Sequence, residues 1–321
     1  MNKSMDKRVY GILGISSLMS NWNADFSGYP KTLSNGKIFG SDKALKYPMK
    51  KMWDSEGKSV VYIKSMRFNS KDSSPTVLIP RTLKERYEYV FKNDDLKDSK
   101  KIDTKKVLTN LMSAVDVKNF GATFAESGCN ISITGAVQIG QGFNKYENSV
   151  AEEQAILSPF RDGSNEKNKE GNEAKNSTLG SKITSNEAHY FYPFVINPLA
   201  YKELIELDVT EGYTQEDYLN FKRTALVSAT SFATNSKVGC ENEFAVFVET
   251  EQDVYLPNLS EYVDFQKTDD KNIIELKFND ILLGVKDRIK SVEIYYNPHT
   301  TKLEGNVDNA KYYNIITQQE V

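Results

Sequence analysis

Apolar and polar positions along the chain follow two spacings, that of a strand and that of a helix. Val9–Leu18 is a short apolar stretch followed by polar residues, which is typical of a buried strand. Asn130–Ile139 alternates as a half-buried strand does, with four residues on one face: Ile131, Ile133, Val137 and Ile139. Between these strands, Asp103 or Thr104 can cap a helix whose apolar stripe should pack on the sheet, formed by Val107, Leu108, Leu111, Met112 and Val115.

The second half of the chain repeats the order of the first. His189–Ile196 is aromatic and β-branched, and Pro193 within it favours an edge strand or a bulge. Thr214 and Asp217 resemble a capping box, and apolar residues follow at helical spacing, namely Tyr218, Phe221, Ala225, Ala229 and Phe232. Glu243–Thr250 has the pattern of another strand.

The order strand, helix, strand, strand, helix, strand predicts an α+β fold with an RRM-like core, the ferredoxin-like βαββαβ pattern. A helix near Asp280–Lys290 and a strand at Val292–Tyr296 extend it. Two long insertions interrupt the core, at residues 22–102 and 141–187, and connections of that length are usually functional or disordered. The second is nearly free of apolar residues over Asp162–Thr178, so we expect its tip to be mobile.

Charge is divided unevenly between these parts. The 321 residues include 41 Lys+Arg and 44 Asp+Glu, a formal net charge of -3 that does not by itself suggest a polyanion-binding protein. Residues 31–106 hold 19 basic and 10 acidic residues, a net of +9, so the remainder carries -12. This asymmetry indicates a polyanion site or self-association through complementary surfaces, and it also fits a solvated lysine-rich surface.

The basic insertion contains a short lysine-bearing helix. Ser41 or Asp42 can cap it, and its lysines recur at three and four residues on one face: Lys43, Lys46 and Lys50. Three ammonium groups in a row can track a phosphate backbone, and the Ser41 hydroxyl can donate to the same backbone. Pro48 requires the helix to be brief or kinked.

Two polar loops offer further hydrogen-bond donors. Gln141, Asn144 and Lys145 follow the second strand. Asn235, Ser236 and Lys237 follow the second helix. Together with the lysine helix, both loops could form a continuous track of donors to phosphates, which positions a strand without reading its sequence. The alternative is that they are ordinary polar loops.

Motifs of known catalytic chemistry are missing from the sequence. There is no P-loop, GxSxG or HExxH, and Gly140–Gly142 lacks the third glycine of a dinucleotide fingerprint. With two cysteines and two histidines, the counts argue against a disulfide framework, a cysteine zinc site and a three-histidine zinc site. Asp25, Asp42 and Asp116 could in principle hold a metal, but each has a simpler role as a turn residue, a helix cap or a residue near a helix end. We predict no cofactor.

No run of the chain approaches the roughly 20 apolar residues that a membrane span needs. The charged N-terminus and the apolar stretch behind it have the pattern of a first strand rather than of a signal peptide. We therefore expect a cytoplasmic protein without a membrane partner.

Six segments in fixed order carry a resemblance to a known family: Arg8–Ile15, Trp22–Pro30, Ile38–Pro48, Asp116–Ala125, Ile133–Gln138 and Ser228–Lys237. The chain resembles the backbone subunit of type I CRISPR Cascade complexes, the Cas7 family, and most closely its type I-B (Csh2) branch. The resemblance covers most of the chain, and the long insertions fall where that family has them.

The resemblance implies a hand-like protein. Its RRM-like palm would be residues 1–21, 103–140 and 188–321, its fingers residues 22–102, and its thumb residues 141–187. Members of the family are non-catalytic, polymerise along the crRNA spacer as a helical filament of neighbouring copies, present the guide for pairing with target DNA, and bind other Cascade subunits. Base pairing then reads the sequence, so the protein needs only backbone contacts, which agrees with the missing catalytic motifs.

The resemblance also implies which residues contact RNA. By matching positions these are Ser41, Lys43, Lys46, Lys50, Asn119, Gln141, Asn144, Lys145, Lys182, Asn235, Ser236 and Lys237. One departure concerns the thumb, because the arginine-rich return usual in the family is present here only as Leu179–Ile183, with Lys182 its single cation.

Two other functions stay open at this point. Related type III backbone subunits cleave target RNA with a loop aspartate, so a metal-dependent RNase that uses Asp25 is one alternative. The other is a protein-interaction module that binds no nucleic acid, which would carry no RNA on purification.

Overall fold

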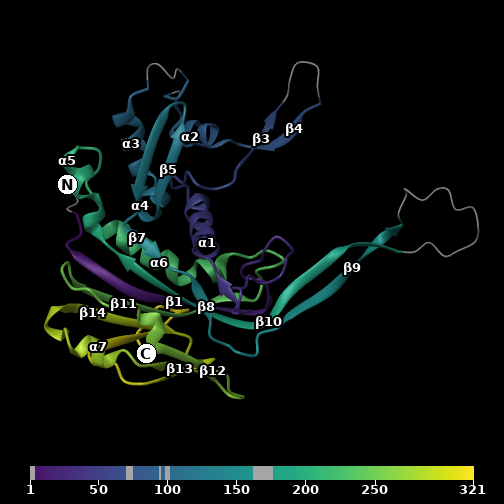
Figure 1. The fold of residues 1–321 in the computed structure, drawn as a ribbon, viewed down its shortest axis with the longest axis vertical. Helices are drawn as coiled ribbons and strands as arrows, with labels where there is room; N and C mark the ends of the chain where they lie inside the picture. Colours follow the sequence, from purple (N-terminus) through teal and green to yellow (C-terminus); the bar gives the residue numbers. More distant parts are fainter. Residues whose placement is uncertain (1–3, 70–74, 94, 98–101, 162–175) are drawn as a thin grey trace, which may run out of the picture.

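The computed structural model describes residues 4–69, 75–93, 95–97, 102–161 and 176–321, so the tip of the second insertion over 162–175 lies outside the described residues. The fold is mixed α+β, with a large central sheet between an upper lobe and a C-terminal layer (Figure 1). Two hairpins, β3–β4 and β9–β10, project from this body on the same side (Figure 1). None of the helices within these described ranges is long and apolar enough to cross a membrane.

The central sheet is ordered β16-β14-β11-β1-β10-β8-β2, and β7 and β9 also pair with β10. Its strands are β1 (Lys7–Ser20), β2 (Phe39–Gly40), β7 (Val137–Ile139), β8 (Gly142–Asn144), β9 (Ala151–Arg161), β10 (Asn176–Ile196), β11 (Cys240–Glu251), β14 (Ile289–Tyr296) and β16 (Ala310–Asn314). β1 pairs antiparallel with both β10 and β11. The strands predicted at 9–18, 189–196, 243–250 and 292–296 are therefore confirmed.

β1 is buried on both faces, which explains its continuous rather than alternating apolar pattern. Val9, Leu13 and Ile15 belong to a core that the sheet shares with the helices. Tyr10 and Ile12, whose side chains point the other way, belong to a second core beneath the C-terminal layer.

Helices α6 (Gln215–Ser231) and α1 (Asp42–Ser55) cover the helical face of the sheet (Figure 1). The predicted capping box of Thr214 and Asp217 at the start of α6 is confirmed. α1 packs on α6, and the indole Nε1 of Trp53 donates to Thr224 Oγ1 at 2.8 Å. This buried contact fixes α1 over the sheet.

The upper lobe consists of α2 (Leu83–Phe91), α3 (Thr104–Ser113), α4 (Val115–Phe120) and the hairpins β3–β4 (Met66–Asn69, Val77–Pro80) and β5–β6 (Gly121–Glu126, Cys129–Thr134). The predicted helix after residue 103 exists as α3 and is capped by Asp103. Its expected packing on the central sheet is wrong, because α3 packs on α4 and α2 in the lobe (Figure 1). Asn110 Nδ2 donates to the Tyr87 hydroxyl of α2 at 2.8 Å.

The single strand expected over Asn130–Ile139 is two strands. β6 pairs with β5 in the upper lobe, whereas β7 joins the central sheet beside β10. The break falls at Gly135, where the backbone of Gly121 passes so closely that a Cβ on Gly135 would lie 2.3 Å from the Gly121 nitrogen. The odd-numbered positions from Ile133 to Ile139 are buried on both sides of the break, and only the buried Ala136 interrupts the alternation, so periodicity could not reveal the break.

Pro193 lies in a central strand, so of the two positions expected for it, an edge strand or a bulge, the edge strand is wrong. It pairs with Ile12 of β1 on one side. On its other side the neighbouring strand is interrupted between β7 and β8, and the Pro193 carbonyl accepts from Gly140 N at 2.8 Å. In a strand, the backbone nitrogen and carbonyl of one residue point to the same side. The Pro193 nitrogen, which carries no hydrogen, therefore faces the interruption, and no hydrogen bond to β1 is lost.

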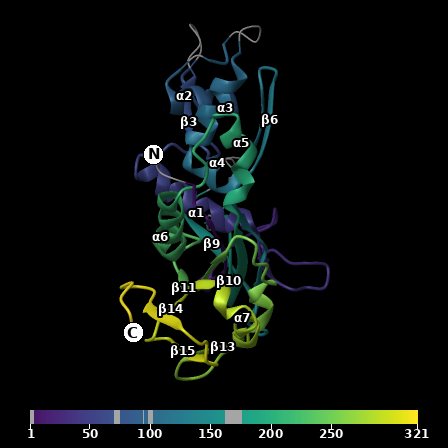
Figure 2. The same cartoon turned by 90° about the vertical axis from the view of Figure 1, so that its left-hand side faces the viewer.

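The C-terminal layer covers the other face of the central sheet, as the view in Figure 2 shows. It contains β12 (Val263–Gln266), β13 (Asn272–Leu276), β15 (Thr301–Glu304) and α7 (Asn279–Leu283). The short helix α5 (Lys202–Glu206) and three 3-10 turns, at Pro198–Tyr201, Leu259–Tyr262 and Lys286–Arg288, complete the elements of the described residues. The helix expected over Asp280–Lys290 is wrong in length. α7 stops at Gly284, which disfavours helix, and β14 already begins at Ile289.

Candidate nucleic-acid interface

The lysine helix α1 starts at the sheet edge beside the β9–β10 hairpin. β2, immediately before it, pairs with β8. Gly40 allows this approach, because a Cβ there would lie 1.8 Å from the Tyr192 hydroxyl, which itself accepts from Trp22 Nε1 at 2.6 Å. Ser41 is the N-cap: its hydroxyl accepts from Ala44 N at 3.3 Å, and its own N–H donates to the Asn23 side chain at 2.7 Å.

α1 runs through Pro48 for 14 residues, so of the two expectations, a brief helix or one kinked at Pro48, the first is wrong. Proline inside a helix removes one backbone hydrogen bond. The helix tolerates the loss because it is held by tertiary packing: Leu45, Met49 and Trp53 on its inner face are fully buried.

The three lysines on the outer face of α1 have different surroundings. Lys43 is exposed and has no ion-pair partner among the described residues. Lys46 pairs with Asp42 at 2.8 Å. Lys50 donates to the Tyr62 carbonyl at 3.3 Å and lies 3.8 Å from Asp116, and burial lowers the pKa of Lys50. Lys43 is thus the member of this row whose charge is free for a phosphate.

Two of the expected RNA contacts are asparagines that hold the fold. Asn119 is fully buried; its Nδ2 donates to the Val115 carbonyl and its Oδ1 accepts from the Tyr213 hydroxyl, each at 2.8 Å. Asn144 accepts from the N–H groups of Tyr146 and His189. Neither side chain is available to a ligand in this conformation.

Two expected lysine contacts are also engaged within the chain. Lys145 donates to the Val263 carbonyl in the C-terminal layer, and burial lowers its pKa. Lys237 donates to the carbonyls of Asn21 and Trp22, and burial lowers its pKa as well. These ammonium groups join distant segments, so the continuous donor track expected from the sequence is interrupted at both.

The remaining expected contacts are more accessible. Gln141 is exposed in the interruption between β7 and β8, and the side chains of Asn235 and Ser236 are exposed in the turn before β11. Lys182 is half-buried on β10, opposite Gln154 of β9. Together with Lys43 they surround the place where the β9–β10 hairpin leaves the body.

Sequence reasoning missed two further cations at this place. Lys31 Nζ lies 5.8 Å from the centre of the Phe39 ring, and Lys37 Nζ lies 4.9 Å from that of Phe143. Phe39 and Phe143 are register partners on β2 and β8, so both lysines stand beside the start of α1. The net charge of residues 31–106 includes them, but they follow no helical spacing that could have singled them out.

The three aspartates considered as metal ligands have structural roles. Asp25 Oδ1 accepts from the N–H and hydroxyl of Ser27 at 2.8 and 2.7 Å, and the hydroxyl bond is the main cause that lowers the pKa of Asp25. Asp42 pairs with Lys46, while Ser41 rather than Asp42 is the helix cap. Asp116 is buried and accepts from two backbone N–H groups. No three His, Cys, Asp or Glu side chains lie together as metal ligands in the part of the chain that the structure describes.

Comparison with known proteins places this architecture in a family. The profile of the family described as CRISPR-associated protein Cas7 matches residues 7–285. The chain belongs to the Cas7 family. The match runs from β1 into the segment between α7 and β14, so it includes the upper lobe, the β9–β10 hairpin and most of the sheet. The family resemblance of the six sequence segments is thereby confirmed.

Two solved chains from surveillance complexes are similar to this Cas7 chain over nearly its whole length. A solved chain titled "CRISPR RNA-guided surveillance complex, pre-nicking" is 14% identical with a TM-score of 0.47, over 95% of this chain and 96% of that one. Another, titled "CRISPR RNA-guided surveillance complex", is 13% identical with a TM-score of 0.41, over 93% and 96%. No curated protein sequence matches the chain.

Proposed function

We propose that this Cas7 chain is the non-catalytic crRNA-binding backbone subunit of a type I-B Cascade complex. It would assemble with neighbouring copies along the crRNA spacer, bind other Cascade subunits and present the guide for pairing with target DNA. The observation that carries the proposal is the family match over residues 7–285. The resemblance of the six segments to the type I-B branch supports the subtype.

Within this proposal, the palm is the RRM-like core of residues 1–21, 103–140 and 188–321, the fingers are residues 22–102, and the thumb is residues 141–187. The strand order β11-β1-β10-β7 supports it, since every neighbouring pair in that order is antiparallel, as in a ferredoxin-like sheet. RNA-recognition modules stack bases on the sheet. Here the C-terminal layer covers that face, so the guide must bind elsewhere.

The guide is proposed to lie on the side from which both hairpins project, over the start of α1. Exposed or half-buried cations without ion-pair partners among the described residues lie at this edge: Lys43 on α1, and Lys31 and Lys37 beside the β2–β8 pair that precedes it, with Lys37 facing the C-terminal layer. Gln141, Asn235 and Ser236 add neutral donors. Such groups bind the phosphates of RNA whatever its base sequence, which suits a subunit that leaves sequence recognition to base pairing.

The decisive experiment measures binding of purified chain to single-stranded RNA of several unrelated sequences at increasing salt. The variant Lys31→Gln/Lys37→Gln/Lys43→Gln should weaken binding for all sequences alike and reduce the salt slope by about 2, at roughly 0.7 per lost phosphate contact on a single strand. The matched control is Lys202→Gln/Lys286→Gln/Lys311→Gln, which removes three exposed lysines of the body. The proposed interface would be refuted if both triple variants weakened RNA binding equally, or if the weakening depended on the RNA sequence.

The same preparation tests the two alternatives. A protein-interaction module would carry no RNA on purification and show no salt-dependent binding to it. An RNase would cleave target RNA paired to the guide when a divalent metal is added, and Asp25→Ala would abolish the cleavage. We expect bound RNA of defined length and no such cleavage, because Asp25 Oδ1 is committed to its own turn.

A further inference from the structure

A fully exposed aromatic residue stands at the foot of the β9–β10 hairpin. Phe26 has a relative exposure of 113%, the highest among the large apolar residues of the described chain. It belongs to a turn, here called the Asp25 turn (residues 24–30), in which Ala24 bridges to Pro30. Isolated exposed apolar residues are common, so exposure alone assigns no role to Phe26.

The Asp25 turn is held rigidly by its own hydrogen bonds. Asp25 Oδ1 accepts from Ser27 N and Oγ and from Tyr29 N at 2.8, 2.7 and 3.1 Å. Asp25 N donates back to the Tyr29 carbonyl at 2.8 Å. The backbone that carries Phe26 is therefore fixed before any ligand arrives, which lowers the entropy that binding costs.

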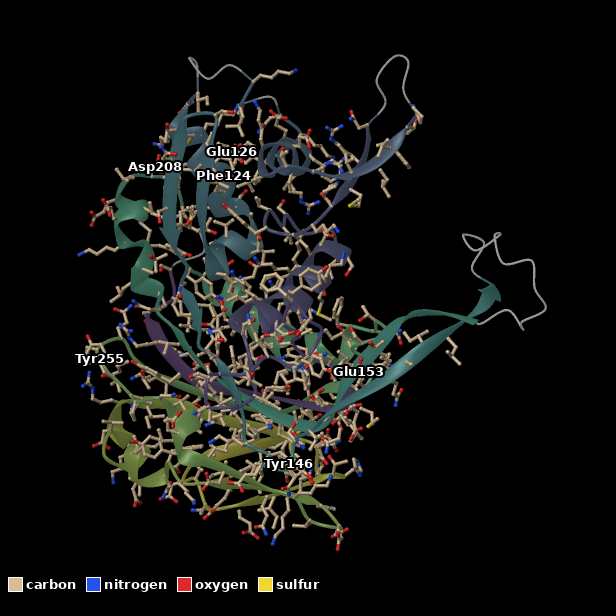
Figure 3. The ribbon with its side chains drawn as sticks, turned by 45° about the vertical axis from the view of Figure 1, so that its right-hand side comes forward. Phe124, Glu126, Tyr146, Glu153, Asp208 and Tyr255 are labelled. Carbon is tan, nitrogen blue, oxygen red and sulfur yellow. The ribbon has the colours of Figure 1, made fainter. Side chains whose placement is uncertain are left out.

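The turn is also tied to both strands of the hairpin. The Tyr29 hydroxyl donates to Glu153 Oε2 of β9 at 2.7 Å. Asn21 Nδ2 donates to the Gly28 carbonyl at 2.8 Å and to the Ile183 carbonyl of β10 at 3.2 Å. Figure 3 labels Glu153 where the hairpin leaves the body. Phe26 thus has a fixed position at the root of the proposed thumb.

The surroundings of Phe26 select the kind of ligand. The residues on either side of it in the turn, Asp25 and Ser27, are polar and exposed, and the exposed Tyr29 is engaged with Glu153 through its hydroxyl. Lys31 follows the turn directly and has no ion-pair partner among the described residues, so it supplies positive charge next to the turn. A single flat ring beside a cation fits a nucleobase whose phosphate the cation holds.

We propose that Phe26 stacks on a base of single-stranded RNA bound along the foot of the β9–β10 hairpin. This inference rests on the proposed function, and it adds a base contact to an interface otherwise built from phosphate contacts. Stacking tolerates every base, since each base has a π-face, so the contact keeps the required independence from sequence.

The test uses the full chain with RNA in which 2-aminopurine replaces single bases in turn, since stacking quenches its fluorescence. Wild type, Phe26→Trp and Phe26→Tyr should quench the 2-aminopurine fluorescence, while Phe26→Ala and Phe26→Leu should not. Affinity of the Ala variant should fall about 5- to 150-fold, the effect of one lost stacked base, with an unchanged salt slope because no charge is removed. Tyr255→Ala, which removes another exposed aromatic (74% exposed) on the opposite side in Figure 3, is the control and should bind as wild type does.

The possible results separate this inference from the proposed function. If the wild type shows no salt-dependent RNA binding, both the proposed function and the stacking site are refuted. If the wild type binds but Phe26→Ala retains both affinity and quenching, only the stacking site is refuted. Full rescue by Phe26→Leu would also refute it, because leucine restores an apolar contact without a ring.

Discussion

Replacing His189 by leucine should destabilise the fold, because this buried ring, 3% exposed, joins two carboxylates. Its Nδ1 lies 2.8 Å from Glu243 Oε2 and its Nε2 lies 2.9 Å from Glu187 Oε1. Carboxylates only accept hydrogen bonds, so both ring nitrogens must donate, which they do only in the imidazolium form. The ring also stacks on Phe265, with centroids 3.9 Å apart, and Lys267 pairs with Glu187 at 2.8 Å.

The proton on His189 is held by two carboxylates, Glu243 of β11 and Glu187 of its own strand. Burial by itself lowers the pKa of His189, but the attraction and hydrogen bonds of Glu243 and Glu187 outweigh it and raise the pKa above its ordinary value. Tyr146 meets the ring edge-on at 6.2 Å and contributes no charge. Because the folded pKa exceeds the unfolded one, the stabilisation is fully present below about pH 6.5 and is lost as the pH rises through the folded pKa.

The loss of stability in His189→Leu follows from the carboxylate that the substitution leaves without a partner. In His189→Leu, Glu187 keeps Lys267, but the buried Glu243, 7% exposed, loses the one charged partner that it has among the described residues. Removing one partner of a buried ion pair costs about 3–5 kcal/mol. With an unfolding entropy of about 2.1 cal/mol/K per residue over the chain, this lowers Tm by roughly 4–7 °C if the chain unfolds as one unit.

Thermal unfolding between pH 6 and pH 9, followed by circular dichroism, is the assay. The Tm difference between wild type and His189→Leu should be largest at pH 6 and should narrow toward pH 9. The double variant His189→Leu/Glu243→Leu should recover much of the loss, because no buried charge then lacks a partner. An unchanged Tm in His189→Leu, or a difference that does not vary with pH, would refute the imidazolium interpretation.

Four further substitutions separate structural from RNA-binding residues. Asp116→Ala leaves two backbone N–H groups, now bonded at 2.9 and 2.7 Å, without their acceptor, and should lower the free energy of unfolding by about 2–6 kcal/mol in denaturant unfolding, at roughly 1–3 kcal/mol per buried group. Gly40→Ala places a Cβ 1.8 Å from the Tyr192 hydroxyl and should destabilise by about 1–3 kcal/mol by the same measurement; wild-type stability would contradict the close approach. Lys43→Gln should reduce the RNA salt slope by about 0.7, whereas Lys50→Gln should leave it unchanged, because Lys50 is already bound within the chain.

Local sequence patterns predicted the elements whose causes are themselves local. The capping box at Thr214, the cap at Ser41 and the long strands depend on neighbours a few residues away, and all of them are present in the structure. Periodicity failed at Gly135, where the chain passes from the upper lobe to the sheet without any change in its alternation. It also could not tell that α3 packs within the lobe.

The candidate interface shows the same division between local and distant causes. The residue pattern alone was enough to predict the family, most of the strand and helix order and the surplus of cations in residues 31–106. Which cations remain free depends on how the chain folds. Lys237 is committed to carbonyls more than two hundred residues earlier in the chain, and Lys50 to Asp116, while Lys43 stays exposed. A lysine has the same appearance in a sequence in either case, because the partner that neutralises or buries it is brought near only by folding.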